Sequence, residues 1–227
     1  LRRVSVLPTE TRRGIAKAMI SGAVSLAVDA GLKRVEVLCR REFPELADWW
    51  GKHGFGLLRE NASGIVLGRD LPVAVTVPTP DAMHALGVEL AGLLRAGDVI
   101  IATGELGAGK TTLARGIGEG LGVEGPVISP TFVLSRIHPS RGGGPDLVHV
   151  DAYRMAGADE LADIDLDATL PGSVTLVEWG EGIAEWLSDE RLEIDIDREI
   201  GDEARRVTLT GTGPRWAGAL EALRRNP

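Results

Sequence analysis

The sequence predicts an α/β fold, with a largely parallel β-sheet flanked by helices. Two short apolar runs, residues 99–102 and 174–177, have the length and composition of buried parallel strands. A glycine-rich stretch at residues 104–111 follows the first run, and residues 112–117 continue as a helix. Strand, glycine-rich turn and helix in direct succession indicate an anion-binding site at the carboxyl ends of the strands.

The glycine-rich stretch fits the P-loop pattern G-x-x-x-x-G-K-[ST] at every fixed position. Its glycines let consecutive backbone N–H groups turn toward phosphate, and the helix start adds a partial positive charge. We expect Lys110 to neutralise phosphate oxygens and the Thr111 hydroxyl to reach Mg²⁺. The residues expected to bind nucleotide are Gly107, Ala108, Gly109, Lys110, Thr111 and Thr112. The alternative, a glycine-rich turn without a ligand, is disfavoured because the flanking segments also match.

Two acidic residues end predicted strands after the P-loop. Asp151 follows residues 147–150, and Glu178 follows residues 174–177. Because ligands gather at the carboxyl ends of strands, we expect Asp151 near the γ-phosphate and Glu178 at Mg²⁺, directly or through water. The alternatives are a helix cap for Asp151 and a surface position for Glu178, while His149 is expected to be a structural strand residue.

A polar turn after the P-loop helix contains Ser129 and Thr131, behind a short strand expected at residues 127–128. Nucleotide-sensing switch segments occupy this position, although the spacing alone slightly favours an ordinary turn. Further along, residues 141–145 predict a hairpin or loop, and residues 192–196 and 206–210 predict two antiparallel edge strands. A short helix is expected at residues 216–223.

The front segment, residues 1–72, predicts the order β-α-β-α-β. Its expected strands are residues 1–7, 33–39 and 65–67, with helices from residue 15 to 30 and from 44 to 53. Residues 73–80 are expected to be a linker, with the first strand of the next domain as the alternative. Residues 81–227 are expected to form the nucleotide domain, and the helix at its start is expected to be capped by Thr79.

Charge is unevenly divided between these parts. Residues 1–72 hold 12 Lys/Arg and 8 Asp/Glu, a net of +4, while residues 73–227 hold 13 and 25, a net of −12; together they give the overall −8. An acidic nucleotide domain is a poor stand-alone binder of nucleic acid. No apolar run approaches the ~18 residues that span a bilayer, and Cys39, the single cysteine, suits a reducing cytoplasm. We therefore expect a cytoplasmic protein without membrane contact.

Residues 6–8, 12–16 and 18–20 resemble the coenzyme A loop of the GNAT acetyltransferases, and residues 45–55 resemble a later helix and strand entry of that family. The resemblance implies acetyl-CoA binding at Arg12, Arg13, Gly14 and Ala16. The segment departs from the family at Thr11, has Trp50 where many members carry a tyrosine acid, and lacks the family's first strands and helices. An active half and a remnant that packs without catalysing both stay open.

Residues 104–112, 129–132, 149–154, 160–161 and 177–179 together resemble the TsaE family, formerly YjeE. Ala152 and Gly180 stand where leucine and proline are common. The resemblance implies a P-loop ATPase, weak alone, that acts with the proteins TsaB and TsaD in threonylcarbamoyladenosine modification of tRNA beside the anticodon. Contact with tRNA would be indirect, through the complex.

The same resemblance assigns roles to single residues. Lys110, Asp151 and Glu178 are implied to be catalytic, Thr111 and Glu178 to hold Mg²⁺, Ser129 and Thr131 to form the switch, and Arg206 to approach the adenine. The alternative function is an acetyl-CoA-dependent N-acetyltransferase fused to a P-loop regulatory domain. A general P-loop kinase is disfavoured because no acceptor lid or set of arginine fingers is evident.

Overall fold

The computed structural model describes residues 4–10, 13–198 and 204–224. The chain divides into two compact units, Leu1–Pro72 and Val73–Pro227, which are described separately below as unit 1 and unit 2.

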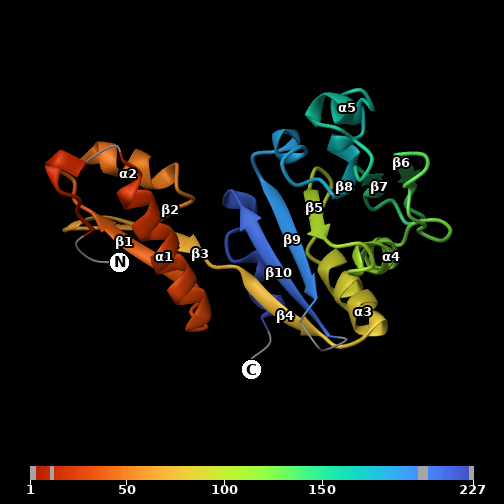
Figure 1. The fold of residues 1–227 in the computed structure, drawn as a ribbon, viewed down its shortest axis with the longest axis horizontal. Coiled ribbons are helices and arrows are strands. Elements are labelled where there is room, and N and C mark those ends of the chain that lie inside the picture. The colour runs from red at the N-terminus through yellow and green to blue at the C-terminus, as the bar shows by residue number, and fades with distance from the viewer. Residues whose placement is uncertain (1–3, 11–12, 199–203, 225–227) are drawn as a thin grey trace. The chain divides into compact units, whose positions relative to one another are not determined.

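Unit 1 consists of a three-stranded antiparallel sheet and two helices (Figure 1). The elements in chain order are α1 (Ile15–Asp29), β1 (Arg34–Cys39), α2 (Pro44–Gly51), β2 (Gly56–Asn61) and β3 (Gly64–Asp70), and the strand order is β1-β3-β2. A small core forms between sheet and helices from Ile20, Ala27, Val35, Val37, Cys39, Trp50, Phe55, Leu67 and Leu71. Cys39 is therefore a buried core residue.

The predicted β-α-β-α-β order of unit 1 is wrong in two places. Residues 4–7 form no strand and lead into a 3-10 turn at Pro8–Glu10; residues 1–3 of the expected strand lie outside the described residues. Strand β2 was not predicted, because its side chains are mostly exposed and carry no apolar alternation. It forms by pairing with β3, a contact that its own sequence does not indicate.

Unit 2 is built on a seven-stranded sheet with the order β4-β10-β9-β5-β8-β7-β6. Strands β7, β8, β5 and β9 are mutually parallel, while β6 and β10 run antiparallel to their neighbours. The strands are β4 (Val73–Val77), β5 (Val99–Gly104), β6 (Ser135–His138), β7 (Asp146–Asp151), β8 (Ser173–Glu178), β9 (Arg191–Arg198) and β10 (Arg205–Thr212). The helices are α3 (Pro80–Ala91), α4 (Lys110–Leu121) and α5 (Ala158–Ala162).

The expected linker at residues 73–80 is instead strand β4 followed by the start of α3. Val73, Val75 and Val77 are buried, while Ala74 and Thr76 are exposed. The segment therefore has one buried face, and it pairs with β10 as a strand instead of forming a solvent-exposed linker. Residues 192–196 and 206–210 pair as antiparallel strands, as predicted. They are not edge strands, because β10 also pairs with β4 and β9 also pairs with β5.

Two further expectations for unit 2 need correction, and one strand was not predicted. Residues 127–128 form no strand. Strand β6, which was not predicted, pairs with β7. The glycine-rich residues 141–145 lie in the connection of this hairpin, as predicted. The expected helix at residues 216–223 is a pair of 3-10 turns, Pro214–Trp216 and Ala219–Leu223, because Gly218 between them has a φ of 72°.

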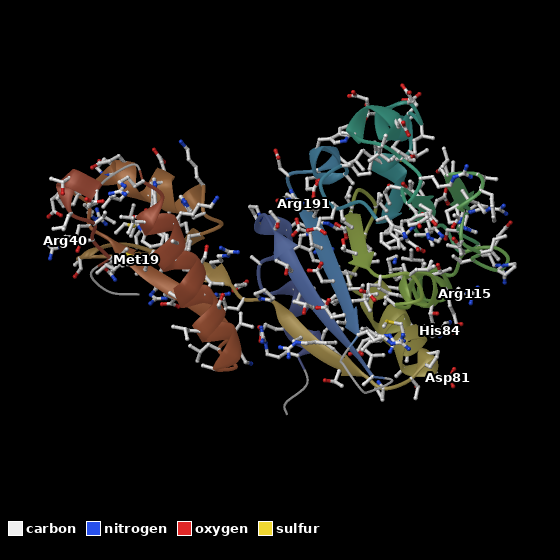
Figure 2. All side chains as sticks on the ribbon, viewed as in Figure 1. Met19, Arg40, Asp81, His84, Arg115 and Arg191 are labelled. Carbon is white, nitrogen blue, oxygen red and sulfur yellow. The ribbon has the colours of Figure 1, made fainter. Side chains whose placement is uncertain are left out.

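The close packing of α3 on α4 fixes the helix that follows the P-loop. A Cβ on Gly116 would lie 2.1 Å from the His84 carbonyl oxygen, and one on Gly87 would lie 2.4 Å from the Leu113 carbonyl oxygen, so only glycine allows this approach. Arg115 of α4, labelled in Figure 2, donates from Nε to the Val127 carbonyl oxygen at 3.2 Å. This bond ties α4 to the segment that leads into Ser129.

Candidate nucleotide-binding site

The P-loop connects β5 to α4 at the carboxyl end of the sheet. β5 ends at Gly104, whose φ of 145° and whose distance of 2.5 Å from an ideal Cβ to the Ile196 carbonyl oxygen both require glycine. α4 begins at Lys110 behind Gly109, and no side chain caps it. The first-turn N–H groups of α4 are therefore left for a ligand.

A cavity of about 270 Å³ opens over this loop. It gathers residues from the P-loop, the Ser-Pro-Thr turn and the ends of β7 and β8. The lining residues are Leu106, Gly107, Gly109, Lys110, Thr111, Thr112, Ser129, Thr131, Asp151, Tyr153, Glu178 and Trp179. The structure thus brings together the predicted site residues of the P-loop, switch and strand ends except Ala108, which is buried beside the cavity.

Lys110 is held inside the loop. Its Nζ donates to the carbonyl oxygens of Gly104 at 2.6 Å and Glu105 at 3.0 Å, and it lies 3.7 Å from the centre of the Trp179 ring. Burial lowers the pKa of Lys110, an effect opposed by the carboxylates of Glu178 and Asp151. The ammonium group is therefore presented from a nearly dry site, 4% exposed, where its attraction to phosphate is screened little.

Trp179 packs against the core and also lines the cavity. It has a left-handed φ of 62° and its ring lies 5.0 Å from that of Tyr153. A positive φ is uncommon for a bulky residue, and its backbone N–H is hydrogen-bonded to the Ala102 carbonyl oxygen at 2.9 Å. The chain turns sharply there, directly after Glu178, and so directs both side chains at the P-loop.

Glu178 contacts the P-loop threonine. The Thr111 hydroxyl donates to Oε1 and Oε2 of Glu178 at 3.0 and 3.3 Å, and His149 Nε2 lies 2.8 Å from Oε1. All three come from different elements, α4, β8 and β7. His149 was predicted to be only a structural residue; its position two residues before Asp151, on the same face of β7, was the signal available in the sequence.

Asp151 organises the Ser-Pro-Thr turn. Its Oδ2 accepts from Ser129 Oγ at 3.2 Å and from the Thr131 hydroxyl, and its Oδ1 accepts from the Tyr153 backbone N–H at 3.0 Å. The alternative role as a helix cap is wrong, because α5 begins at Ala158 with Gly157 as its N-cap. Asp151 therefore links the end of β7 to both predicted switch residues.

Arg206 is not part of this cavity. It is exposed on β10, opposite Asp197 of β9 and Thr76 of β4. An approach of Arg206 to adenine stays a prediction.

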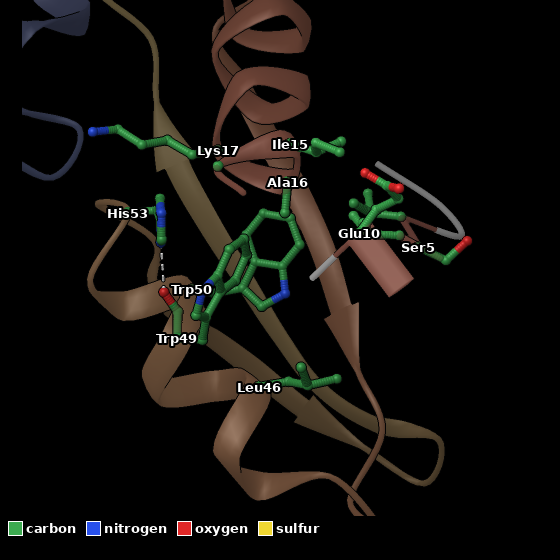
Figure 3. A pocket seen from close by; sticks show the side chains of 12 residues that line it. Ser5, Glu10, Ile15, Ala16, Lys17, Leu46, Trp49, Trp50 and His53 are labelled. Atoms are coloured by element: carbon green, nitrogen blue, oxygen red, sulfur yellow. Dashed lines mark hydrogen bonds between the residues drawn. The ribbon is translucent and has the colours of Figure 1, made fainter. Parts of the chain in front are cut away.

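A second cavity, of about 470 Å³, lies in unit 1 beside the expected coenzyme A loop. Figure 3 shows Trp49, Trp50 and His53 along it, with Ala16 at the start of α1. The Trp49 and His53 rings are 4.1 Å apart, and His53 Nδ1 lies 2.7 Å from the Trp49 carbonyl oxygen. Gly14 lines the cavity and precedes α1 without a capping side chain; Arg13 pairs with Glu10 instead, and Arg12 lies outside the described residues.

The strand, loop and helix of unit 2 and its sheet define a P-loop nucleotide-binding fold. Residues 77–207 match the family described as "Threonylcarbamoyl adenosine biosynthesis protein TsaE". The chain belongs to this family, as its sequence motifs predicted.

Relatives and a solved structure agree with this assignment. The chain is 62% identical over 141 residues to the tRNA threonylcarbamoyladenosine biosynthesis protein TsaE of Streptomyces coelicolor, covering 60% of this chain and 95% of that protein. It is 42% identical over 148 residues to the same-named protein of Bacillus subtilis, covering 65% and 90%. The crystal structure of Bacillus subtilis YdiB superposes with a TM-score of 0.56 at 36% identity, covering 67% of this chain and 93% of that one.

None of the helices in the described residues is long and apolar enough to cross a membrane.

Proposed function

We propose that the chain is a Mg²⁺-dependent, ATP-binding and ATP-hydrolysing subunit that supports threonylcarbamoyladenosine modification of tRNA next to the anticodon, acting with TsaB and TsaD. The observation that carries the proposal is the meeting of Lys110, Thr111, Asp151 and Glu178 at one cavity in a member of the TsaE family. The names of its relatives support the pathway. We also propose a cytoplasmic location, in keeping with that role.

The donor set fits Mg²⁺ together with a nucleotide. Thr111 and Glu178 offer a hydroxyl and a carboxylate 3.0 Å apart, which are the hard oxygen ligands that Mg²⁺ prefers. In the described residues no cluster of three or more His, Cys, Asp or Glu side chains could hold a metal alone. This suits an ion that takes one or two protein oxygens and completes its shell with phosphate and water. When bound, the ion would neutralise charge on the β- and γ-phosphates.

The protein's own groups divide the remaining tasks. The N–H groups at the start of α4 and the Lys110 ammonium would bind phosphate, for which Lys110 exchanges its present carbonyl partners for phosphate oxygens. Asp151, already bonded to Ser129 and Thr131, would couple occupancy of the γ-phosphate position to the conformation of that turn.

Partner docking is proposed at the mouth of the same cavity. Leu106 and Phe132 are 85% and 89% exposed, and Tyr153 is more than half exposed. Leu106 and Tyr153 line the cavity, and Phe132 follows Thr131 of the switch. Exposed large apolar side chains gathered at a site favour a protein interface, and a turn that nucleotide orders would make docking depend on ATP.

A multiple-turnover tRNA modification assay with purified TsaB, TsaD and this chain tests the proposal. Asp151→Ala should keep nucleotide binding but fail to support repeated product formation, whereas the exposed Asp159→Ala on α5 should behave as the wild type. Full product yield without the chain, or with the Asp151→Ala variant, would reject the function.

A second candidate, coenzyme A binding by unit 1, rests on the cavity at Gly14 and Ala16. Its helix start without a side-chain cap and its aromatic wall suit a ligand with an anionic and an apolar part. Calorimetry should detect coenzyme A binding that the cavity-filling Ala16→Phe removes and Lys110→Ala, in the other unit, leaves intact. Absence of binding by the wild type would reject this candidate, and acetylation of peptide amines at an ordinary enzymatic rate would show an active half rather than a remnant.

A further inference from the structure

His149 is completely buried on β7, and the hydrogen bond it makes goes to the candidate site. Its Nε2 lies 2.8 Å from Oε1 of Glu178, the same oxygen that accepts from the Thr111 hydroxyl at 3.0 Å. The parallel register pairs Asp151 with Glu178 and His149 with Leu176, so the imidazole reaches the carboxylate diagonally across the two strands. Oε1 of Glu178 is thus contacted by both a hydroxyl and an imidazole.

The geometry restricts what the imidazole can do. In the tautomer that carries hydrogen on Nε2, the ring donates to Glu178 and Nδ1 becomes an acceptor. Nδ1 has no hydrogen-bond partner among the described residues. A purely structural histidine would be expected to satisfy both nitrogens or to be replaced by an apolar side chain, because a buried polar atom without a partner costs free energy. The contact with Glu178 explains why a histidine stands at position 149 despite the cost of its Nδ1, unpaired among the described residues.

We propose that His149 is a positioning residue that fixes the Glu178 carboxylate in the orientation that meets Thr111. The inference rests on the proposed function, since it concerns the carboxylate proposed to hold Mg²⁺. Glu178 is 3% exposed, and its carboxylate contacts the Thr111 hydroxyl through both oxygens and the imidazole through Oε1. Removal of the imidazole would leave the carboxylate with the Thr111 hydroxyl bond and one fewer restraint on its rotation. Partners that orient a metal-binding carboxylate commonly change metal affinity by about 10- to 100-fold when they are removed.

His138 supplies a matched control. It lies on β6 opposite Leu147, which shares a face of β7 with His149, and it is 4% exposed. Its Nε2 also has no hydrogen-bond partner among the described residues. Replacing His138 therefore removes a second buried imidazole from the same face of the sheet without removing a bond to the site.

The test measures metal binding rather than turnover. Each protein is loaded with a non-hydrolysable ATP analogue and titrated with Mg²⁺ in a calorimeter, with thermal unfolding recorded in parallel. His149→Leu should raise the half-saturating Mg²⁺ concentration by roughly 10- to 100-fold and leave the affinity for the metal-free analogue unchanged. His149→Gln, whose amide nitrogen can donate from a similar position, should recover most of the loss, and His138→Leu should match the wild type.

The outcomes separate this inference from the proposed function. A wild type whose nucleotide complex does not bind Mg²⁺ contradicts the metal role of Glu178 itself. A wild type that binds Mg²⁺ with a His149→Leu variant of equal affinity overturns the positioning role, as does a His149→Gln variant no better than His149→Leu. If His149→Leu does not fold, His149→Phe replaces it, because phenylalanine keeps a buried ring but lacks the Nε2 donor to Glu178. A His149→Phe affinity for Mg²⁺ equal to that of the wild type then overturns the positioning role.

Discussion

The two units of the chain treat polar and apolar side chains in opposite ways. Every buried polar or charged side chain in the described residues belongs to unit 2, and four of them, Lys110, His149, Asp151 and Glu178, belong to or contact the nucleotide cavity. In unit 1 the buried residues of the described part are apolar. Burying a polar group costs free energy unless the group is paired. The burial of several polar side chains around one cavity therefore indicates a functional site.

The contrast reverses for exposed apolar residues. Among the residues that the structure describes, nine of the sixteen exposed large hydrophobic side chains lie in unit 1, which holds less than a third of the chain. They include Met19 and Leu26 on α1. The largest fully buried side chains of the described ranges all lie in unit 2. Unit 1 therefore has the thinner core, and we expect it to be the less stable of the two units. The nucleotide cavity lies in the unit with the larger core.

A pair of leucine substitutions tests the difference in packing and carries the largest expected effect. Leu176 is completely buried on the interior strand β8, so Leu176→Ala should destabilise unit 2 by about 2–5 kcal/mol through lost burial and a residual cavity. Leu26→Ala, on α1 and 71% exposed, should change stability by less than about 0.5 kcal/mol. Native-state hydrogen exchange read on peptides of each unit measures both. Equal losses of stability in the two variants would mean that the apolar face of α1 is covered in solution. That result would contradict the difference in packing between the units.

A pair of lysine substitutions tests the difference in polar chemistry. Lys110→Ala removes charge-assisted phosphate contacts, each worth about 1.5–3 kcal/mol, so ATP affinity should fall roughly 10- to 100-fold. Lys17→Ala, which removes the lysine beside the unit 1 cavity, should leave ATP affinity unchanged. Calorimetric titration of each variant with a Mg²⁺-bound ATP analogue measures the two affinities. Equal affinities in wild type and Lys110→Ala would place the nucleotide elsewhere.

The smallest expected effect concerns the acidity of unit 2. Burial first, and then the nearby carboxylates of Glu181, Asp197 and Glu193, raise the pKa of Asp195 above its ordinary 3.8. A raised carboxyl pKa means that the folded state binds the proton more tightly, so stability falls as the pH rises through the interval above 3.8. Asp195→Asn should therefore stabilise unit 2 at pH 7, with an advantage that shrinks as the pH is lowered toward 3.8.

Urea unfolding at several pH values measures this effect, with the exposed Asp167→Asn as the control. An Asp195→Asn advantage that is independent of pH would assign the gain to packing rather than to charge.

Local sequence determined much of unit 2. The sequence predicted the P-loop, the two strands ending in Asp151 and Glu178, and the Thr79-capped α3, because each depends on residues adjacent in the chain. The cap is visible as the Thr79 Oγ1 that accepts from the Ala82 N–H at 3.1 Å. Family membership followed from the same motifs, because their residues and their order along the chain can be read without knowledge of the fold.

Only the tertiary structure decided which of these residues meet. The contact of Thr111 with Glu178 joins residues 67 positions apart, and that of His149 with Glu178 depends on the register of β7 against β8. The apolar alternation of residues 73–77 suits a strand, but it became one only by pairing with β10, more than 100 residues later in the chain. Side-chain type and spacing determine which local element forms, whereas strand pairing and burial, which act between distant segments, determine which polar groups share a site.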